Sequence, residues 1–245
     1  MGDEQTDQNG LAERWTKQGF DRLLSVHRPA VLAHLRSIRK HHPTASPDEV
    51  IRVLERRYVT AVTAGGAATG AAAFVPGVGT VASIGISGVE TVGFLEASAL
   101  FAQSVAEVHG IPTEDPERAS TLVMALMLGP SGASIVKQFA SEVSGTGKPR
   151  NAYWGDLVTK TLPTTMLKTL TDRVKKSFLK RFAARQGASV VLRAVPFGVG
   201  AVVGGAGNRI AGQRVAKATR EAFGPAPAGF PAEIQLPDAP KAVGA

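Results

Sequence analysis

Apolar residues recur at helical spacing through most of the chain, and no segment keeps the apolar–polar alternation of a β-strand. A first helix is predicted from Leu11 to about His42, with a kink or break at Pro29. Its apolar face is formed by Leu24, Val31, Leu35 and Ile38. The pattern predicts an all-α fold.

Start and stop signals divide the middle of the chain into further helices. Ser46-Pro47-Asp48-Glu49 is a capping box with proline at the first helical position, so a helix is expected to begin at Pro47. The turn Val75–Thr80 interrupts the apolar region that follows, and a second helix runs from about Thr80 to His109. Gly110 closes that helix.

The remaining signals complete the domain organisation. Helices are predicted from Asp115 through Leu128, over 131–143 and over 156–186 as a helix or helix pair, and small-residue helical sequence broken by Pro196 follows over 188–223. Residues 1–10 form a flexible lead, 11–223 a single helical domain with a candidate linker at 144–155, and 224–245 a proline-rich disordered tail.

Two stretches are rich in glycine and alanine. No charged residue occurs from Tyr58 to Val89, and the small-residue pattern returns at 188–223. Each stretch contains a Val-Pro turn, at Val75-Pro76 and Val195-Pro196. We therefore expect a helical bundle with two glycine/alanine-rich helix hairpins that could pack face to face.

Glycine inside a helix costs about 1 kcal/mol relative to alanine, so repeated glycines indicate close helix packing. Gly66 and Gly70, and likewise Gly200 and Gly204, have the spacing that places small residues on one helix face, as in a glycine zipper. A helix from Val59 to Val75 would be about 25 Å long, a little short of the hydrocarbon core. The sequence is therefore compatible with three arrangements of these helices: a full membrane span, a shallow insertion and a soluble core.

Glu90 lies in the predicted helix that follows the first Val-Pro turn. It shares a helix face with Gly93, Phe94, Ala97 and Phe101, whereas Glu96, Gln103 and Glu107 form a separate polar face. A carboxylate on a packed face needs a partner. Asn208 and Arg209 are the expected partners, in a buried polar group that fixes the register of the helices.

The segment 156–185 is strongly basic and amphipathic. We expect its cations to contact anionic headgroups, and the predicted lipid- or anion-binding residues are Lys168, Arg173, Lys175, Lys176, Lys180, Arg181 and Arg185. The apolar residues between them, expected to face lipid if the cations snorkel, are Leu162, Leu167, Leu170, Val174, Phe178 and Phe182. A plain solvated helix face is the alternative.

The amino-acid composition limits the classes of partner and of chemistry that we expect for this protein. A formal net charge of +8 favours polyanions, but aromatic residues make up only 6% and no helix-turn-helix or zinc-finger signature is present, which argues against nucleic acid. The chain has no cysteine, which excludes disulfides and thiolate chemistry. Its polar start lacks a secretory signal, so we expect the protein on the cytoplasmic side.

Three chemical motifs fail on inspection. Gly147-Lys148-Pro149 lacks the residues of a phosphate-binding loop, and Gly85-Ile-Ser87-Gly88-Val89 misplaces the last glycine of a nucleophile elbow. His27, His34 and His41 recur every seven residues, too far apart to hold one metal without other ligands. The sequence predicts no catalytic residue, no metal site and no cofactor.

Several motifs resemble the EcsC family of bacterial proteins over roughly residues 50–224. They are Phe74-Val-Pro-Gly-Val-Gly-Thr80, Ala106-Glu-Val-His-Gly-Ile-Pro112 with Asp115-Pro-Glu-Arg118, Val195-Pro-Phe-Gly-Val-Gly-Ala-Val-Val-Gly-Gly-Ala-Gly-Asn208, Val215-Ala-Lys-Ala218 and Ala222-Phe223. At Glu90 the chain departs from the family, whose members tend to carry an aspartate after a proline there. The resemblance implies a helical protein linked by name to an ABC-transporter operon and often associated with membranes.

The functional prediction is a non-enzymatic, membrane-associated helical protein on the cytoplasmic face, peripheral to or shallowly inserted in the inner membrane. Its partners would be anionic lipid or a membrane protein complex. The alternative is a soluble helical interaction module that regulates a transporter or another partner. A third hypothesis is a lipid-modifying activity centred on Glu90.

Overall fold

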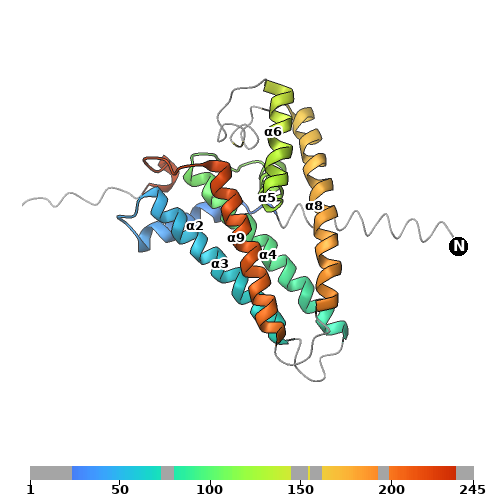
Figure 1. The fold of residues 1–245 in the computed structure, drawn as a ribbon. Coiled ribbons are helices and arrows are strands. Elements are labelled where there is room, and N and C mark those ends of the chain that lie inside the picture. The colour runs from blue at the N-terminus through green and yellow to red at the C-terminus, as the bar shows by residue number, and fades with distance from the viewer. Residues whose placement is uncertain (1–23, 73–79, 145–153, 155–161, 193–198, 236–245) are drawn as a thin grey trace, which may run out of the picture.

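The chain folds into packed helices (Figure 1). The computed structural model describes residues 24–72, 80–144, 154, 162–192 and 199–235, with side chains described except at 69–72, 80–89, 143–144, 182–192 and 199–203. Within these ranges there are seven α-helices, one 3-10 helix and no strand, which confirms the all-α prediction. The helices are α2 (Arg28–His41), α3 (Pro47–Ala72), α4 (Thr80–Val108), α5 (Pro116–Met127), α6 (Pro130–Ser144), α8 (Thr164–Leu192), α9 (Val199–Phe223) and the 3-10 helix η1 (Ala232–Ile234).

Local capping fixes several helix boundaries as predicted. The Ser46 backbone N–H donates to the Glu49 carboxylate at 2.7 Å, and the Glu49 N–H donates to the Ser46 hydroxyl at 3.3 Å, which confirms the capping box before α3. The Asp115 carboxylate accepts from the Arg118 N–H at 2.9 Å and caps α5. Pro29 lies in the first turn of α2, where a missing N–H costs nothing.

Four long helices reach the same end of the molecule (Figure 1). The C-terminal ends of α3 and α8 and the N-terminal ends of α4 and α9 all lie there. α3 packs on both α4 and α9, whereas α8 packs on α5 and α6. The glycine-rich helix α9 therefore lies against the first predicted hairpin, α3 and α4.

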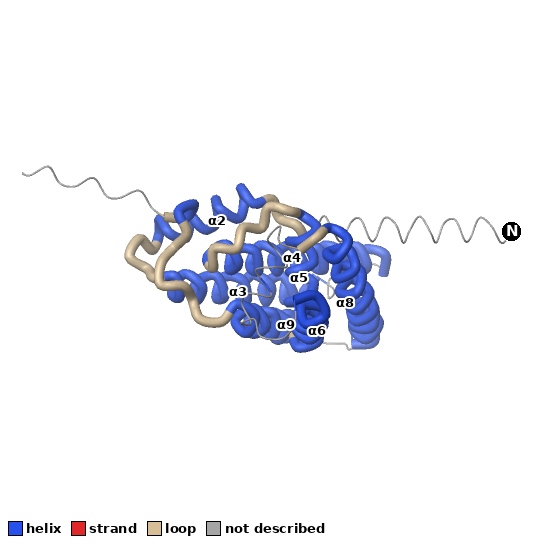
Figure 2. Tube along the Cα trace, turned by 90° about the horizontal axis from the view of Figure 1, so that it is seen from above, coloured by secondary structure: helices blue, strands red, loops and turns tan. Residues whose placement is uncertain are grey.

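The opposite end of the molecule holds most of the described core. α5 is buried at every position from Arg118 to Leu126, and α4 is buried at every position from Phe101 to Val108. Seen from above, α2 and α9 lie on opposite sides of the α3–α4 pair (Figure 2). One continuous apolar cluster extends from Leu24 to Ile234.

The chain after α9 is ordered through residue 235, so the expectation of a disordered tail is wrong for 224–235. Gly224 has φ +76° and turns the chain out of α9. Ile234 is then buried in the core, and the Arg39 guanidinium lies 3.9 Å from the ring centre of Phe230. The Arg36 guanidinium donates to the Glu233 carbonyl at 3.1 and 3.2 Å. Proline-rich composition suggested disorder, but two apolar anchors and the α2 arginines hold this segment in place.

Three other parts of the predicted organisation fall wholly or largely outside the described residues. The flexible lead at 1–10 and the tail beyond 235 lie outside them, as does most of the candidate linker at 144–155. Within that linker, Ser144 ends α6 and Trp154 is buried in the apolar cluster.

Candidate functional site

The clearest candidate site is the end of the molecule that the four long helices reach (Figure 1). The parts of these helices nearest that end contain no charged residue, over 58–72 in α3, 80–89 in α4, 186–192 in α8 and 199–208 in α9. We call this region the uncharged end (Figure 1). Of its two connections, residues 73–79 carry no charge and residues 193–198 carry one, Arg193. Within the described residues, no helix has the length and apolar character needed to cross a bilayer.

Charged residues mark the boundary of the uncharged end, and on three of its four helices the first of them is basic. Moving inward along each helix, the first charged residues are Arg57 in α3, Glu90 in α4, Arg185 in α8 and Arg209 in α9. At 1.5 Å per residue, these positions lie about 10–22 Å from the helix ends. We call Arg57, Arg185 and Arg209 the basic boundary.

The helix packing inside this boundary depends on glycine. Gly66 of α3 is buried, and a Cβ added there would lie 2.5 Å from the Gly204 carbonyl oxygen and 2.7 Å from the Asn208 amide nitrogen. Because the nearest of these atoms is backbone, any side chain at position 66 would force α3 and α9 apart. The structure thus brings Gly66 and Gly204 together. Gly70 and Gly200 lie on the same two helices, where side-chain surroundings are not described.

A polar link joins the same place to α4. The Asn208 amide donates to the Glu90 carboxylate at 3.0 Å, and both side chains are half-buried. Gly66, Asn208 and Glu90 therefore connect α3, α9 and α4 just inside the uncharged end. Arg209 does not share this burial: its side chain is exposed, because the residue after Asn208 is turned about 100° around the helix.

The expected polar face of α4 is wrong at two of its three positions. Glu96 is exposed, but Gln103 and Glu107 are buried. The Gln103 side-chain amide pairs with the backbone of Val26: its nitrogen donates to the carbonyl at 2.8 Å and its oxygen accepts from the N–H at 3.0 Å. The reason is tertiary: α2 and the segment before it cover this face of α4.

Glu107 forms the central ion pair of the opposite end. Its carboxylate accepts from the Arg28 Nε at 2.8 Å and from a second guanidinium nitrogen at 3.1 Å, in a bidentate pair. It also accepts from the Thr113 backbone N–H at 3.0 Å. The hydrogen bond to Glu107 and the negative charge of that carboxylate raise the pKa of Arg28 above its ordinary value. The pair ties the start of α2 to the end of α4, and only the tertiary structure brings its two partners together.

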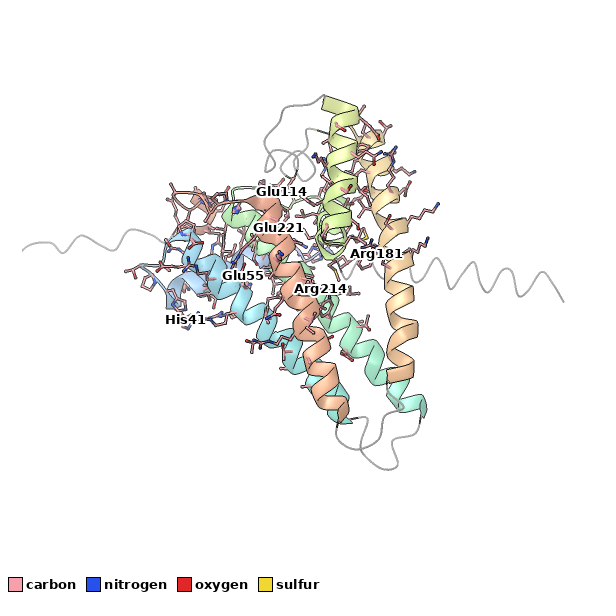
Figure 3. The ribbon with its side chains drawn as sticks, viewed as in Figure 1. His41, Glu55, Glu114, Arg181, Arg214 and Glu221 are labelled. Atoms are coloured by element: carbon pink, nitrogen blue, oxygen red, sulfur yellow. The ribbon has the colours of Figure 1, made fainter. Side chains whose placement is uncertain are left out.

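The predicted anion-binding residues of α8 have mixed surroundings. Lys168, Lys176 and Lys180 are exposed, and Lys175 is half-buried. Arg173 pairs with Glu142 of α6 at 3.0 Å, and Arg181, labelled in Figure 3, donates to the Ser131 hydroxyl at 2.7 Å. Arg185 lies in α8, with its side chain outside the described set.

The apolar side of α8 is not available to lipid, which corrects the amphipathic-helix hypothesis. Leu167, Leu170, Val174 and Phe178 are all buried, and Leu162 packs on the same cluster. They face α5 and α6, which occupy the surface that would otherwise enter a membrane. Phe182 lies beyond the described side chains. Helical periodicity identified this stripe but could not tell lipid from core.

The three spaced histidines have separate surroundings. His27 is exposed, the Nδ1 of His41 lies 2.7 Å from the Ser37 carbonyl, and the Nδ1 of His34 lies 3.4 Å from the Ser104 hydroxyl. Ser104 is fully buried, so its hydroxyl cannot meet a substrate in this conformation. Among the described residues no cluster of histidine and carboxylate side chains could hold a metal ion.

Comparison of the chain with protein-family models, with curated proteins and with solved structures found no match. The resemblance to the EcsC family therefore stays a prediction. The functional argument rests on the uncharged end and its basic boundary.

Proposed function

We propose that this protein acts by binding rather than by catalysis, and that it attaches to the cytoplasmic face of a membrane through its uncharged end. The observation that carries the proposal is that four uncharged helix segments extend to one end of the molecule. Water-soluble surfaces are rich in charge, so a large uncharged region needs an apolar environment or a partner.

The dimensions favour a shallow insertion. The uncharged segments are about 10–22 Å long, measured along each helix. One leaflet contributes about half of a hydrocarbon core that is about 30 Å thick. The uncharged end would therefore enter one leaflet and leave the rest of the protein, with its buried ion pair, in water.

The charges at the boundary favour anionic lipid. Arg57 and Arg209 are exposed, and the acidic residue at this level, Glu90, accepts a hydrogen bond from Asn208. Basic residues near an anionic surface contribute about 1 kcal/mol each. The exposed lysines of α8 would add a longer-range attraction, in place of the lipid contact first expected of that helix.

Single labels would test the orientation directly. The chain has no cysteine, so Thr80→Cys at the uncharged end and Ser141→Cys near the far end of α6 each give one site for an environment-sensitive fluorophore. On vesicles rich in anionic phospholipid, the label at position 80 should shift to the blue and the label at 141 should not. Equal behaviour of both labels would refute the proposed orientation.

Charge reversal would test the lipid class. Replacing Arg57, Arg185 and Arg209 by glutamate should weaken binding to anionic vesicles by at least about a hundredfold, from about 1 kcal/mol for each lost cation. Reversing Lys168, Lys176 and Lys180, three exposed lysines of α8 outside the basic boundary, gives the same change in net charge and should weaken binding less. If wild type binds neutral and anionic vesicles equally, the basic boundary has no role in binding.

A protein partner is the second candidate, and a separate observation favours it. Gly65 of α3 and Gly207 of α9 are exposed, and a Cβ added at either would meet no atom within 4 Å. Packing within the chain therefore does not require glycine there, whereas a closely approaching partner helix would. Crosslinking from Gly207→Cys to a membrane protein, without any attachment to protein-free vesicles, would favour this candidate.

A further inference from the structure

A cavity of about 450 Å³ lies between α5, α6 and α9, away from the uncharged end. Its walls are mainly apolar and include Ala125 of α5, Ala133 of α6, Ala218 of α9 and the buried Trp154. Lys137 and Glu221 stand at its rim, and Glu221 is labelled on α9 in Figure 3. The volume is within the roughly 300–1,000 Å³ of pockets that hold small molecules.

Two glycines shape the junction of α5 and α6 beside this cavity, and one of them, Gly129, lines it. Gly129, with φ +61°, makes the tight turn that sends α6 back beside α5. A Cβ added at Gly132 would lie 1.9 Å from the Ala125 carbonyl oxygen, so the two helices touch through backbone at this point. On the opposite wall, Ala218 and Ala222 present small side chains and leave the space open.

The rim carries one cation available to a ligand. Lys137 is exposed, and none of the ion pairs among the described residues involves its ammonium. Glu221, in contrast, has the ammonium of Lys217 at 3.9 Å, one helical turn earlier on α9. A ligand with one negative group can therefore pair with Lys137, while Glu221 disfavours a second negative charge beside it.

We infer that this cavity binds a small amphipathic anion. Its apolar body lies among Ala125, Ala133, Ala218 and Trp154, and its single negative group pairs with Lys137. A medium-chain carboxylate has this chemistry. The inference is independent of the membrane proposal, because it involves neither the uncharged end nor the basic boundary.

Trp154 supplies the readout for a test with decanoate below its micelle concentration and without vesicles. The chain has two tryptophans, so Trp15→Phe leaves Trp154 as the only one. In that background decanoate should change the tryptophan emission saturably. Lys137→Ala should weaken decanoate binding by about tenfold or more and leave decanol binding unchanged, because only the carboxylate pairs with the ammonium. Lys168→Ala, on an exposed lysine of α8, is the matched control.

Filling the cavity gives a second measurement. Ala133 is exposed on α6, so Ala133→Phe should fold and should abolish binding of both ligands. Absence of saturable decanoate binding to wild type, or binding that survives Ala133→Phe, would overturn the site. Equal effects of Lys137→Ala and Lys168→Ala would overturn the assignment to an anion. None of these results depends on whether the protein binds vesicles.

Discussion

Alanine substitutions at two adjacent glycines of α3 would measure how closely this helix approaches α9. A Cβ at Gly66 would lie 2.5 Å from the Gly204 carbonyl oxygen, whereas a Cβ at Gly65 meets no atom within 4 Å. The two residues occupy the same helix, one position apart. The intrinsic gain in helix propensity is therefore nearly equal, and the difference between the two variants reports packing.

The expected signs are opposite. Gly65→Ala should raise the free energy of unfolding by about 0.5–1 kcal/mol through helix propensity. Gly66→Ala receives the same gain but adds a methyl group to a filled interface, which costs about 1–3 kcal/mol. The two variants should therefore differ by about 1–3 kcal/mol. For a chain of this size, each kcal/mol corresponds to about 2–4 °C in Tm.

Circular dichroism at 222 nm during thermal and urea unfolding would measure both variants beside wild type. These measurements should be made without vesicles, because membrane binding would itself stabilise the folded state. If Gly66→Ala stabilises the protein as much as Gly65→Ala does, α3 and α9 are not in backbone contact in solution. The argument from close helix approach would then be refuted.

Three further predictions concern the opposite end of the molecule and the helix caps. Arg28→Met leaves the buried Glu107 carboxylate without its cation. The free energy of unfolding, measured in a urea titration, should decrease by about 3 kcal/mol. A decrease of less than about 1 kcal/mol would show that water solvates this carboxylate. Burial lowers the pKa of His109 from its ordinary value of 6.5. As the pH falls below about 6.5, the unfolded chain therefore binds a proton at His109 before the folded chain does. The free energy of unfolding should thus be unaffected by this histidine above about pH 6.5 and should decrease below it. His109→Asn should reduce this decrease, and an unchanged pH profile of the unfolding free energy would contradict the assignment. Ser46→Ala removes the side-chain half of the capping box with Glu49 and should cost about 1 kcal/mol, measured in the same titration against Ser141→Ala on exposed α6 as control.

The sequence by itself determined the helices and most of their boundaries. The capping box at Ser46, the proline after Asp115 and the glycines that end helices act within a few residues, so their effects can be recognised without the rest of the fold. The stripe of Leu167, Leu170 and Val174 was also visible as a helical face. Local interactions of this kind do not depend on which elements meet in space.

Only the tertiary structure decided what each helix face contacts. An apolar stripe has the same spacing whether it faces lipid or core, and α5 and α6 assign the stripe of α8 to the core. Gln103 and Glu107 look like a solvated face in sequence, but the Arg28 guanidinium and the backbone before α2 satisfy them in the interior. The ordered segment around Ile234 has the same origin, because its anchors pack on helices about two hundred residues earlier.

The uncharged end combines both kinds of information. The sequence showed that 58–89 and the start of α9 lack charge, because charge is a property of each residue alone. The fold decided that these segments lie at one end of the molecule, together with the end of α8, and that Gly66 approaches Gly204 from another helix. A contact between residues so distant in sequence depends on the packing of the whole chain, and no local pattern encodes it.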